Sequence, residues 1–312
     1  MNRGTPRPPT RSQGAGTPPL LPEGIQPLLW HDAALLEKLW QAEREQSLFG
    51  RQHPERSGPA WWSTRSRSYT LRTGGERGKR RQAQVLQLLE QARFVNRQAE
   101  VLDIGCGPGN VALPVARHVK KVVALDPSED MLAQLRARAT AEGITNIETV
   151  CMPWEAINLD ELGWRGRFRL AIASMTPGIH DVATLRKMND ASHCGCFFNG
   201  FTQRVDRAHE DLWRLFFHEP IPAIPADVFC VFHLLHAWGY CPSLELSREK
   251  SRKQYALEEA VEELRLLMIP YVEQTNKTLS TIRRYVESAG REGKFLHERS
   301  FVEGRMLWSV KQ

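Results

Sequence analysis

A glycine-rich turn and an acidic residue downstream are the features of this sequence most able to do chemistry. Residues 101–110 read Val-Leu-Asp-Ile-Gly-Cys-Gly-Pro-Gly-Asn, and a second apolar run ends at Asp126. Glycine adopts positive φ easily and lets a ligand lie against the backbone. A helix starting after the turn offers free N–H groups, and an acid at the next strand end can bind both ribose hydroxyls. The pattern predicts a site for a nucleoside-containing cofactor.

The spacing of the glycines narrows the choice of cofactor. Gly105, Gly107 and Gly109 alternate, whereas a dinucleotide fingerprint needs G-x-G-x-x-G. Pro108 has no N–H to give to a pyrophosphate. No Gly-Lys-Ser/Thr follows the turn, which argues against a P-loop.

The segment VLDIGCGPGN, followed by VVALDPSEDML, resembles the first two motifs of the class I S-adenosylmethionine-dependent methyltransferases. The resemblance covers residues 99–201. It implies that S-adenosyl-L-methionine is the cofactor and S-adenosyl-L-homocysteine the product. It also implies that the glycine turn lies under the methionine moiety, that Asp126 binds the ribose, and that Asp103 fixes the turn near the methionine amino group. The candidate cofactor-binding residues are Asp103, Gly105, Cys106, Gly107, Gly109, Asp126, Pro127, Met131, Trp154, Glu155, Ser174 and Tyr69.

The loop after the third expected strand contains Trp154 and Glu155. In the superfamily this loop covers the adenine, so the resemblance implies that Glu155 binds its exocyclic amine and that Trp154 walls the ring. An alternative stays open, in which Trp154 belongs to the core and Glu155 is an acid at a helix N-terminus.

The fourth expected strand ends in Ser-Met-Thr-Pro-Gly-Ile-His, residues 174–180. This position faces the methyl group in the superfamily. Enzymes that methylate nucleobase amines often carry Asn/Asp-Pro-Pro-Tyr/Phe here, so the sequence argues against adenine-N6 chemistry. Thr176 and His180 are the candidate catalytic residues, with His180 as a general base. A solvated or structural histidine is the alternative.

Four further residues are candidates for contact with the substrate. The segment from Trp61 to Tyr69 resembles the lead-in of small-molecule methyltransferases, which closes over the cofactor. Arg65 there could pair with the methionine carboxylate or with an acidic substrate, although a core aromatic cluster beside a solvated basic face explains it equally well. The substrate candidates are Trp61, Arg65, Met175 and Trp238.

A fold must bring these residues together, and the hydrophobic pattern predicts one. Apolar runs typical of strands alternate with helical periodicity at 99–104, 110–118, 121–125, 128–141, 146–151, 168–174, 182–191 and 193–201. Such alternation predicts an α/β fold, a Rossmann-like seven-stranded and mostly parallel sheet with helices on both faces. Helices are expected earlier at 30–49 and 76–94. Later expectations are a short strand at 243–247, helices at 257–274 and 278–289, and an antiparallel pair at 294–301 and 304–310.

The expected organisation has five parts along the 312 residues. They are a flexible tail at 1–29, an N-terminal helical cap at 30–98, the S-adenosylmethionine-binding core at 99–203, a helical insertion at 204–242 that interrupts the sheet and roofs the substrate, and a C-terminal part of the core at 243–312. His233 and His236 share a helix face with Cys230 nearby, but neighbouring apolar residues favour ordinary packing, and no metal is expected.

Composition limits the functional classes. The net charge of +6 is too small to diagnose a nucleic-acid partner. No apolar run is long enough to span a membrane, and no secretory signal is seen, so a cytoplasmic enzyme with reduced cysteines is expected. The prediction is a methyltransferase acting on a small molecule. The alternatives are an RNA or protein methyltransferase that uses the basic stretch at 65–81, and a cofactor-binding protein without turnover; oligomeric state stays open.

Overall fold

The computed structural model describes residues 32–53, 58, 62–63 and 75–311. The expected tail at 1–29 lies outside these residues. All six cysteines lie within them and are unpaired. No helix in the described part of the chain is both long and apolar enough to cross a bilayer.

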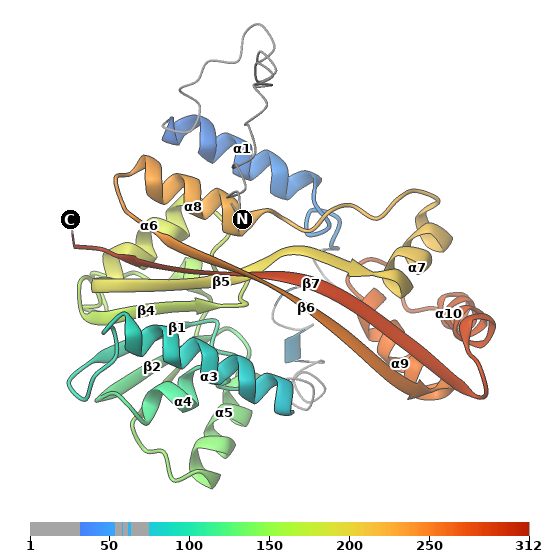
Figure 1. Cartoon of the computed structure of the whole chain (residues 1–312), viewed down its shortest axis with the longest axis horizontal. Helices are drawn as coiled ribbons and strands as arrows, with labels where there is room; N and C mark the ends of the chain where they lie inside the picture. Colours follow the sequence, from blue (N-terminus) through green and yellow to red (C-terminus); the bar gives the residue numbers. More distant parts are fainter. Residues whose placement is uncertain (1–31, 54–57, 59–61, 64–74, 312) are drawn as a thin grey trace, which may run out of the picture.

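One seven-stranded sheet organises the chain, in the order β3-β2-β1-β4-β5-β7-β6 (Figure 1). The first five strands are parallel, β7 is antiparallel to β5, and β6 is antiparallel to β7. The strands are β1 (Glu100–Ile104), β2 (Lys121–Asp126), β3 (Ile147–Cys151), β4 (Phe168–Ser174), β5 (Ser192–Asp206), β6 (Ser243–Ala256) and β7 (Lys294–Ser309). The predicted Rossmann-like fold is confirmed.

The sheet order reverses between β1 and β4, and this reversal places the functional loops. The carboxyl ends of parallel strands share one edge, so the loops after β1, β2, β3 and β4 meet there. Ligands of open α/β sheets bind at such a crevice. The glycine turn, Asp126 and the residues after Ser174 therefore lie at one edge, as expected.

Helices cover both faces of the sheet. One layer contains α3 (Glu76–Gln91), α4 (Ala112–Ala116) and α5 (Glu129–Ala141). The opposite layer contains α1 (Ala33–Gln46), η3 (Trp154–Ala156), α6 (Val182–Ala191) and α8 (Asp227–Ala237). Each layer packs its own set of buried residues against the sheet, as parallel strands require.

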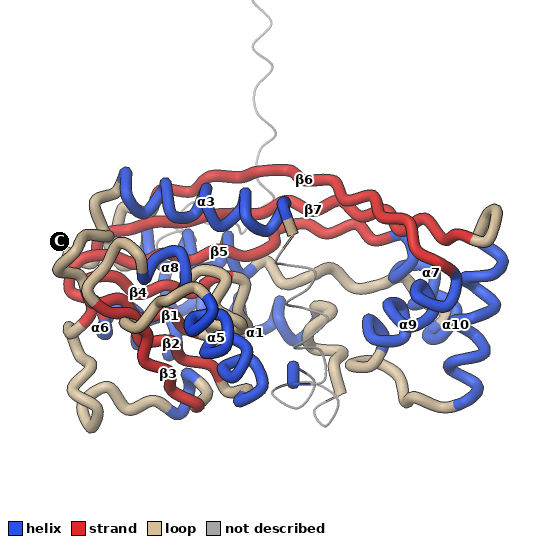
Figure 2. Tube along the Cα trace, turned by 90° about the horizontal axis from the view of Figure 1, so that it is seen from below, coloured by secondary structure: helices blue, strands red, loops and turns tan. Residues whose placement is uncertain are grey.

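A second, smaller body lies beyond the core formed by β1 to β4 and their helices. Strands β5, β6 and β7 continue past the core as a twisted ribbon and carry α7 (Arg207–Phe217), α9 (Leu257–Met268) and α10 (Asn276–Ala289) at its far end (Figures 1 and 2). These helices enclose a separate apolar cluster around Leu212, Leu264, Ile282 and Phe295. We call this body the distal lobe.

The C-terminal third differs from its sequence-based prediction. β5 runs on to Asp206, so residues 204–242 do not form one insertion that interrupts the sheet: α7 joins the distal lobe and α8 joins the core. The short strand at 243–247 is a long strand, and the expected pair at 294–301 and 304–310 is the single strand β7. Gly304 makes no turn there. A Cβ on it would lie 2.6 Å from Val228 Cγ1, so this glycine allows α8 to pack closely.

Candidate active site

The glycine turn is fixed to the neighbouring strand through its backbone. The N–H groups of Gly105 and Cys106 both donate to the carbonyl oxygen of Leu125, at 2.7 and 2.9 Å. Gly105 and Gly107 have φ of +67° and +52°, a region that glycine enters without steric cost. The turn is thus pre-formed at the edge where β1 and β2 end.

The three glycines of the turn differ in what surrounds them. A Cβ on Gly105 would lie 1.9 Å from Thr176 Oγ1, and one on Gly109 would lie 2.4 Å from Leu135 Cδ1. A Cβ on Gly107 would meet nothing within 4 Å. Only Gly107 therefore borders open space that a ligand could fill. Gly109 allows the turn to pack against α5, and its predicted contact with the cofactor stays a prediction.

Asp126 lies at the end of β2 with both carboxylate oxygens engaged. Oδ2 accepts from the Gly107 N–H and Oδ1 from the Ser128 N–H, each at 2.9 Å. Burial raises the pKa of this carboxyl, and the two N–H groups oppose that rise. Each carboxylate oxygen has a second lone pair, so Asp126 can still accept from two hydroxyls of a ribose.

Asp103 is the buried acid beneath the turn. It is 1% exposed, and its Oδ2 has no hydrogen-bond partner among the described residues. Burial and the nearby charge of Asp126 raise its pKa to about 7, against a backbone hydrogen bond from Ala112. An unpartnered acid of this kind fits a cation, such as the ammonium group of a methionine moiety. With the open space at Gly107, it makes the site suitable for S-adenosylmethionine.

The loop after β4 lies directly on the glycine turn. Thr176 Oγ1 occupies the place of the missing Gly105 side chain and accepts from the Gly178 N–H at 3.1 Å. Met175 has φ of +53°, a left-handed conformation that is unusual for a side chain of this kind. Ser174 and Met175 are half-buried beside it. The expected proximity of this loop to the cofactor turn is thus present.

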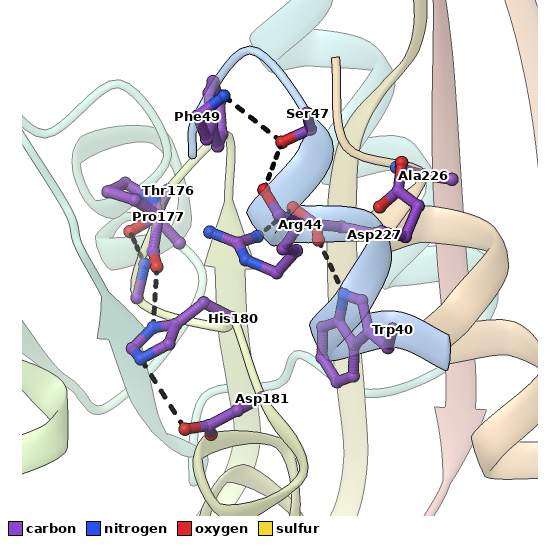
Figure 3. A network of polar contacts seen from close by, with 12 residues as sticks. Trp40, Arg44, Ser47, Phe49, Thr176, Pro177, His180, Asp181, Ala226 and Asp227 are labelled. Atoms are coloured by element: carbon purple, nitrogen blue, oxygen red, sulfur yellow. Dashed lines mark hydrogen bonds and ion pairs between the residues drawn. The ribbon is translucent and has the colours of Figure 1, made fainter. Parts of the chain in front are cut away.

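His180 is oriented by its own loop (Figure 3). Its Nδ1 lies 3.1 Å from the carbonyl oxygen of Pro177, which can only accept, so Nδ1 must carry the hydrogen. Nε2 then holds a lone pair and lies 3.7 Å from Asp181 Oδ2. The imidazole is about one-third exposed. This arrangement leaves Nε2 as the ring nitrogen that can accept a proton.

Helices α1 and α8 add polar groups that the sequence analysis did not select. Arg44 Nη1 pairs with Asp227 Oδ2 at 2.5 Å, and Trp40 Nε1 donates to Asp227 Oδ1 at 2.7 Å. Figure 3 shows the Arg44 guanidinium between Asp227 and the loop that carries His180. The spacing of Trp40 and Arg44, one helical turn apart, was visible in the sequence, but nothing there indicated Asp227 as their partner.

The prediction for Trp154 is corrected, and the substrate contact of Trp238 stays a prediction. Trp154 is 2% exposed, lies in the core and donates its Nε1 hydrogen to the Thr184 carbonyl oxygen, so its ring does not wall a ligand. Trp238 follows the end of α8 opposite to Asp227 and packs against the Arg186 guanidinium at 4.1 Å. Both rings are held in place by packing with their neighbours.

The remaining candidates occupy varied positions. Cys106 and Met131 are buried, Pro127 is half-buried, and Glu155 is exposed at η3. The Cys106 side chain packs in the buried cluster under α3, α4 and α5, and burial raises the pKa of its thiol. Trp61, Arg65 and Tyr69 lie outside the described residues. Ser63, which is described, has its Oγ 3.0 Å from Ser128 Oγ, beside Asp126.

No group of three or more histidine, cysteine or acidic side chains in the described ranges is arranged to hold a metal ion.

Comparisons with known proteins agree with the glycine turn. A family model described as a methyltransferase domain matches residues 101–191, which run from β1 to the end of α6. A 23S rRNA (uracil(1939)-C(5))-methyltransferase of Photobacterium angustum is 45% identical over 49 residues, 16% of this chain and 22% of that protein. An uncharacterized protein of Haemophilus influenzae is 41% identical over 76 residues, 24% of this chain and 28% of that protein. The alignments span less than a third of these relatives.

Among solved structures, magnesium protoporphyrin IX methyltransferase of Synechocystis with bound S-adenosylhomocysteine is similar at 12% identity and a TM-score of 0.47. The match covers 78% of this chain and 96% of that one.

Proposed function

We propose that this chain is a class I S-adenosylmethionine-dependent methyltransferase that transfers the methyl group to a small-molecule acceptor, on the basis of the methyltransferase-domain match over residues 101–191 and the sheet order. S-adenosylmethionine is the cofactor, and its sulfonium supplies a methyl group that is already activated. The protein then has to align the acceptor in line with that methyl group and keep water away.

One observation carries the proposal of a small acceptor. The Arg44–Asp227 pair, which joins α1 to α8, is drawn in Figure 3 next to the β4 loop that carries Thr176 and His180, and these polar side chains are partly buried. The side chains of Arg44 and Asp227 are 18% and 17% exposed. Polar groups enclosed in this way fit a compact ligand with few polar atoms, as in other small-molecule sites.

His180 is the proposed general base. An acceptor whose nucleophilic oxygen or nitrogen carries a proton at neutral pH would lose it to Nε2, because Nδ1–H is occupied by Pro177. Asp181, 3.7 Å from Nε2, would stabilise the imidazolium that forms. Thr176, which lies against the glycine turn, would contact the methyl group and the acceptor atom that receives it.

RNA is the second candidate acceptor, favoured by the local identity with rRNA methyltransferases. The position of Arg81 argues against RNA binding by the basic stretch at 65–81. Its Nε lies 3.1 Å from Glu303 Oε2, and its Nη2 lies 3.4 Å from Glu249 Oε2. An arginine already paired with two carboxylates is a poor phosphate contact.

Calorimetric titration with S-adenosylhomocysteine tests the cofactor site. Wild-type protein should bind it. Asp126→Ala should weaken binding by about 100-fold or more, because two hydrogen bonds to a charged acceptor are lost. Wild-type protein that binds neither S-adenosylmethionine nor S-adenosylhomocysteine would overturn the assignment.

Transfer of a radioactive methyl group to a fractionated cell extract tests the acceptor. The label should appear in the low-molecular-weight fraction, and His180→Gln should reduce it by about 100-fold with unchanged cofactor affinity. Label in ribonuclease-sensitive material would support RNA instead. Cofactor binding with no transfer to any fraction would indicate a protein without turnover.

A further inference from the structure

The left-handed backbone at Met175 is held by the backbone and the side chain of one residue on the next strand, Asn199. The Met175 N–H donates both to the backbone oxygen of Asn199, at 3.0 Å, and to its Oδ1, at 3.1 Å. A left-handed conformation is unfavourable for a residue other than glycine, so it persists only where neighbouring groups impose it.

Asn199 is itself fixed by a buried charge. It is 1% exposed, and its Nδ2 donates to Glu303 Oε1 on β7 at 2.7 Å. A carboxylate only accepts, so Glu303 dictates which end of the Asn199 amide is the donor and turns Oδ1 toward Met175. An aspartate at position 199 could not make both contacts.

Two arginines hold Glu303 in turn. Arg305 Nε lies 3.1 Å from Glu303 Oε1, and Arg81 Nε lies 3.1 Å from Oε2. Glu303 is fully buried, so it needs these partners. Arg81 comes from α3 and Arg305 from β7, so the chain of contacts joins α3, β7 and β5 to the loop after β4.

The loop that this chain of contacts fixes also contacts the cofactor turn. Thr176, the next residue after Met175, has its Oγ1 where a side chain on Gly105 would be, 1.9 Å from that Cβ position. A change in the Met175 backbone therefore displaces Thr176 relative to the glycine turn.

We propose that Asn199 and Glu303 are positioning residues that set the Met175–Thr176 loop and so determine how the site distinguishes S-adenosylmethionine from S-adenosylhomocysteine. The inference rests on the proposed function, in which the transferred methyl group faces this loop. Neither residue need touch the cofactor, because both act through the Met175 amide.

The test is the ratio of the two dissociation constants, measured by calorimetry on the full chain. Asn199→Ala should change the ratio by about fivefold, the effect of one hydrogen bond. Asn189→Ala is the matched control: Asn189 is also a buried asparagine, but it accepts from Trp308 Nε1 in the core. It should lower thermal stability and leave the ratio unchanged. An unchanged ratio in Asn199→Ala, or an equal change in the control, would overturn the proposal.

A donor–acceptor exchange gives a second test if Asn199→Ala does not fold. Asn199→Asp alone places two carboxylates in contact and should change the ratio. Adding Glu303→Gln restores a donor–acceptor pair with position 199 at the total charge of the wild type. Because the new amide nitrogen also faces Arg305 Nε, the ratio should return part of the way to its wild-type value. A double variant that behaves like Asn199→Asp would contradict the proposal. Wild-type protein that binds neither nucleoside would instead contradict the proposed function.

Discussion

At the scale of single residues, the glycine turn separates ligand contact from packing. Gly107→Ala adds a methyl group to open space at φ of +52°, whereas Gly109→Ala drives one into Leu135. Gly107→Ala should therefore weaken S-adenosylhomocysteine binding by tenfold or more at a stability cost of about 1–2 kcal/mol. Gly109→Ala should cost about 1–3 kcal/mol more through overpacking. Calorimetry measures the affinity for S-adenosylhomocysteine, and urea unfolding measures the free energy of unfolding. If Gly109→Ala weakened binding as much as Gly107→Ala does, the two glycines would not differ in ligand contact.

Asp103 links pH to both stability and binding. Its pKa of about 7 lies above the ordinary value of 3.8, so the folded protein without cofactor holds this proton more tightly than the unfolded chain. The stabilising contribution is complete below pH 4 and is lost as pH rises through about 7. Asp103→Asn should flatten this part of the pH profile of urea unfolding. Affinity for S-adenosylmethionine, a cation, should rise over the same range in the wild type and not in the variant.

At the scale of elements, α1 is held against α8 by the contacts of Asp227 with Trp40 and Arg44. A double-mutant cycle on Arg44→Met and Asp227→Asn should give a coupling energy of about 1–3 kcal/mol. The single variants should also loosen α1, measured as faster amide exchange over 33–46, while α4 and α5 stay protected. A coupling near zero would mean that apolar packing alone holds the two helices together.

At the scale of the whole molecule, the distal lobe has its own buried polar centre. Asp206 accepts from His297 Nε2 at 2.8 Å, and both side chains are almost fully buried. Beside them, burial and the Arg204 charge lower the pKa of His209 to about 3. The hydrogen bond between His297 and Asp206 gives these two buried side chains a partner at the junction between β5 and α7.

This centre should make the lobe sensitive to acid. The lowered pKa of His209 means that its neutral form contributes stability above pH 6.5, which is lost as pH falls toward 3. Amide exchange over 257–289 should accelerate through that range before exchange in the core does, and His209→Gln should reduce the effect. Asp206→Ala should cost about 1–3 kcal/mol, because it leaves the buried Nε2 of His297 without its hydrogen-bond partner. Uniform acceleration across core and lobe would contradict separate stability.

The sequence by itself determined the nucleotide-binding half of the protein. Backbone turns and strand ends depend on local residue types: Gly105 and Gly107 permit the turn, and Asp126 ends an apolar strand. Hydrophobic periodicity then places these residues at one edge of a parallel sheet.

Only the tertiary structure decided the rest. Arg44 meets Asp227 across 183 positions and Asn199 meets Glu303 across 104, and no local pattern encodes such pairs. The sequence places Gly304 at the start of a second strand, after a break at 302–303. In the structure it lies within β7, where the close approach of α8 leaves no room for a side chain. Trp154 was predicted from its place in the sequence to lie against the adenine ring, but its side chain is buried in the core. Packing between distant segments assigns the roles of these side chains, because burial and partners depend on which surfaces the fold brings together.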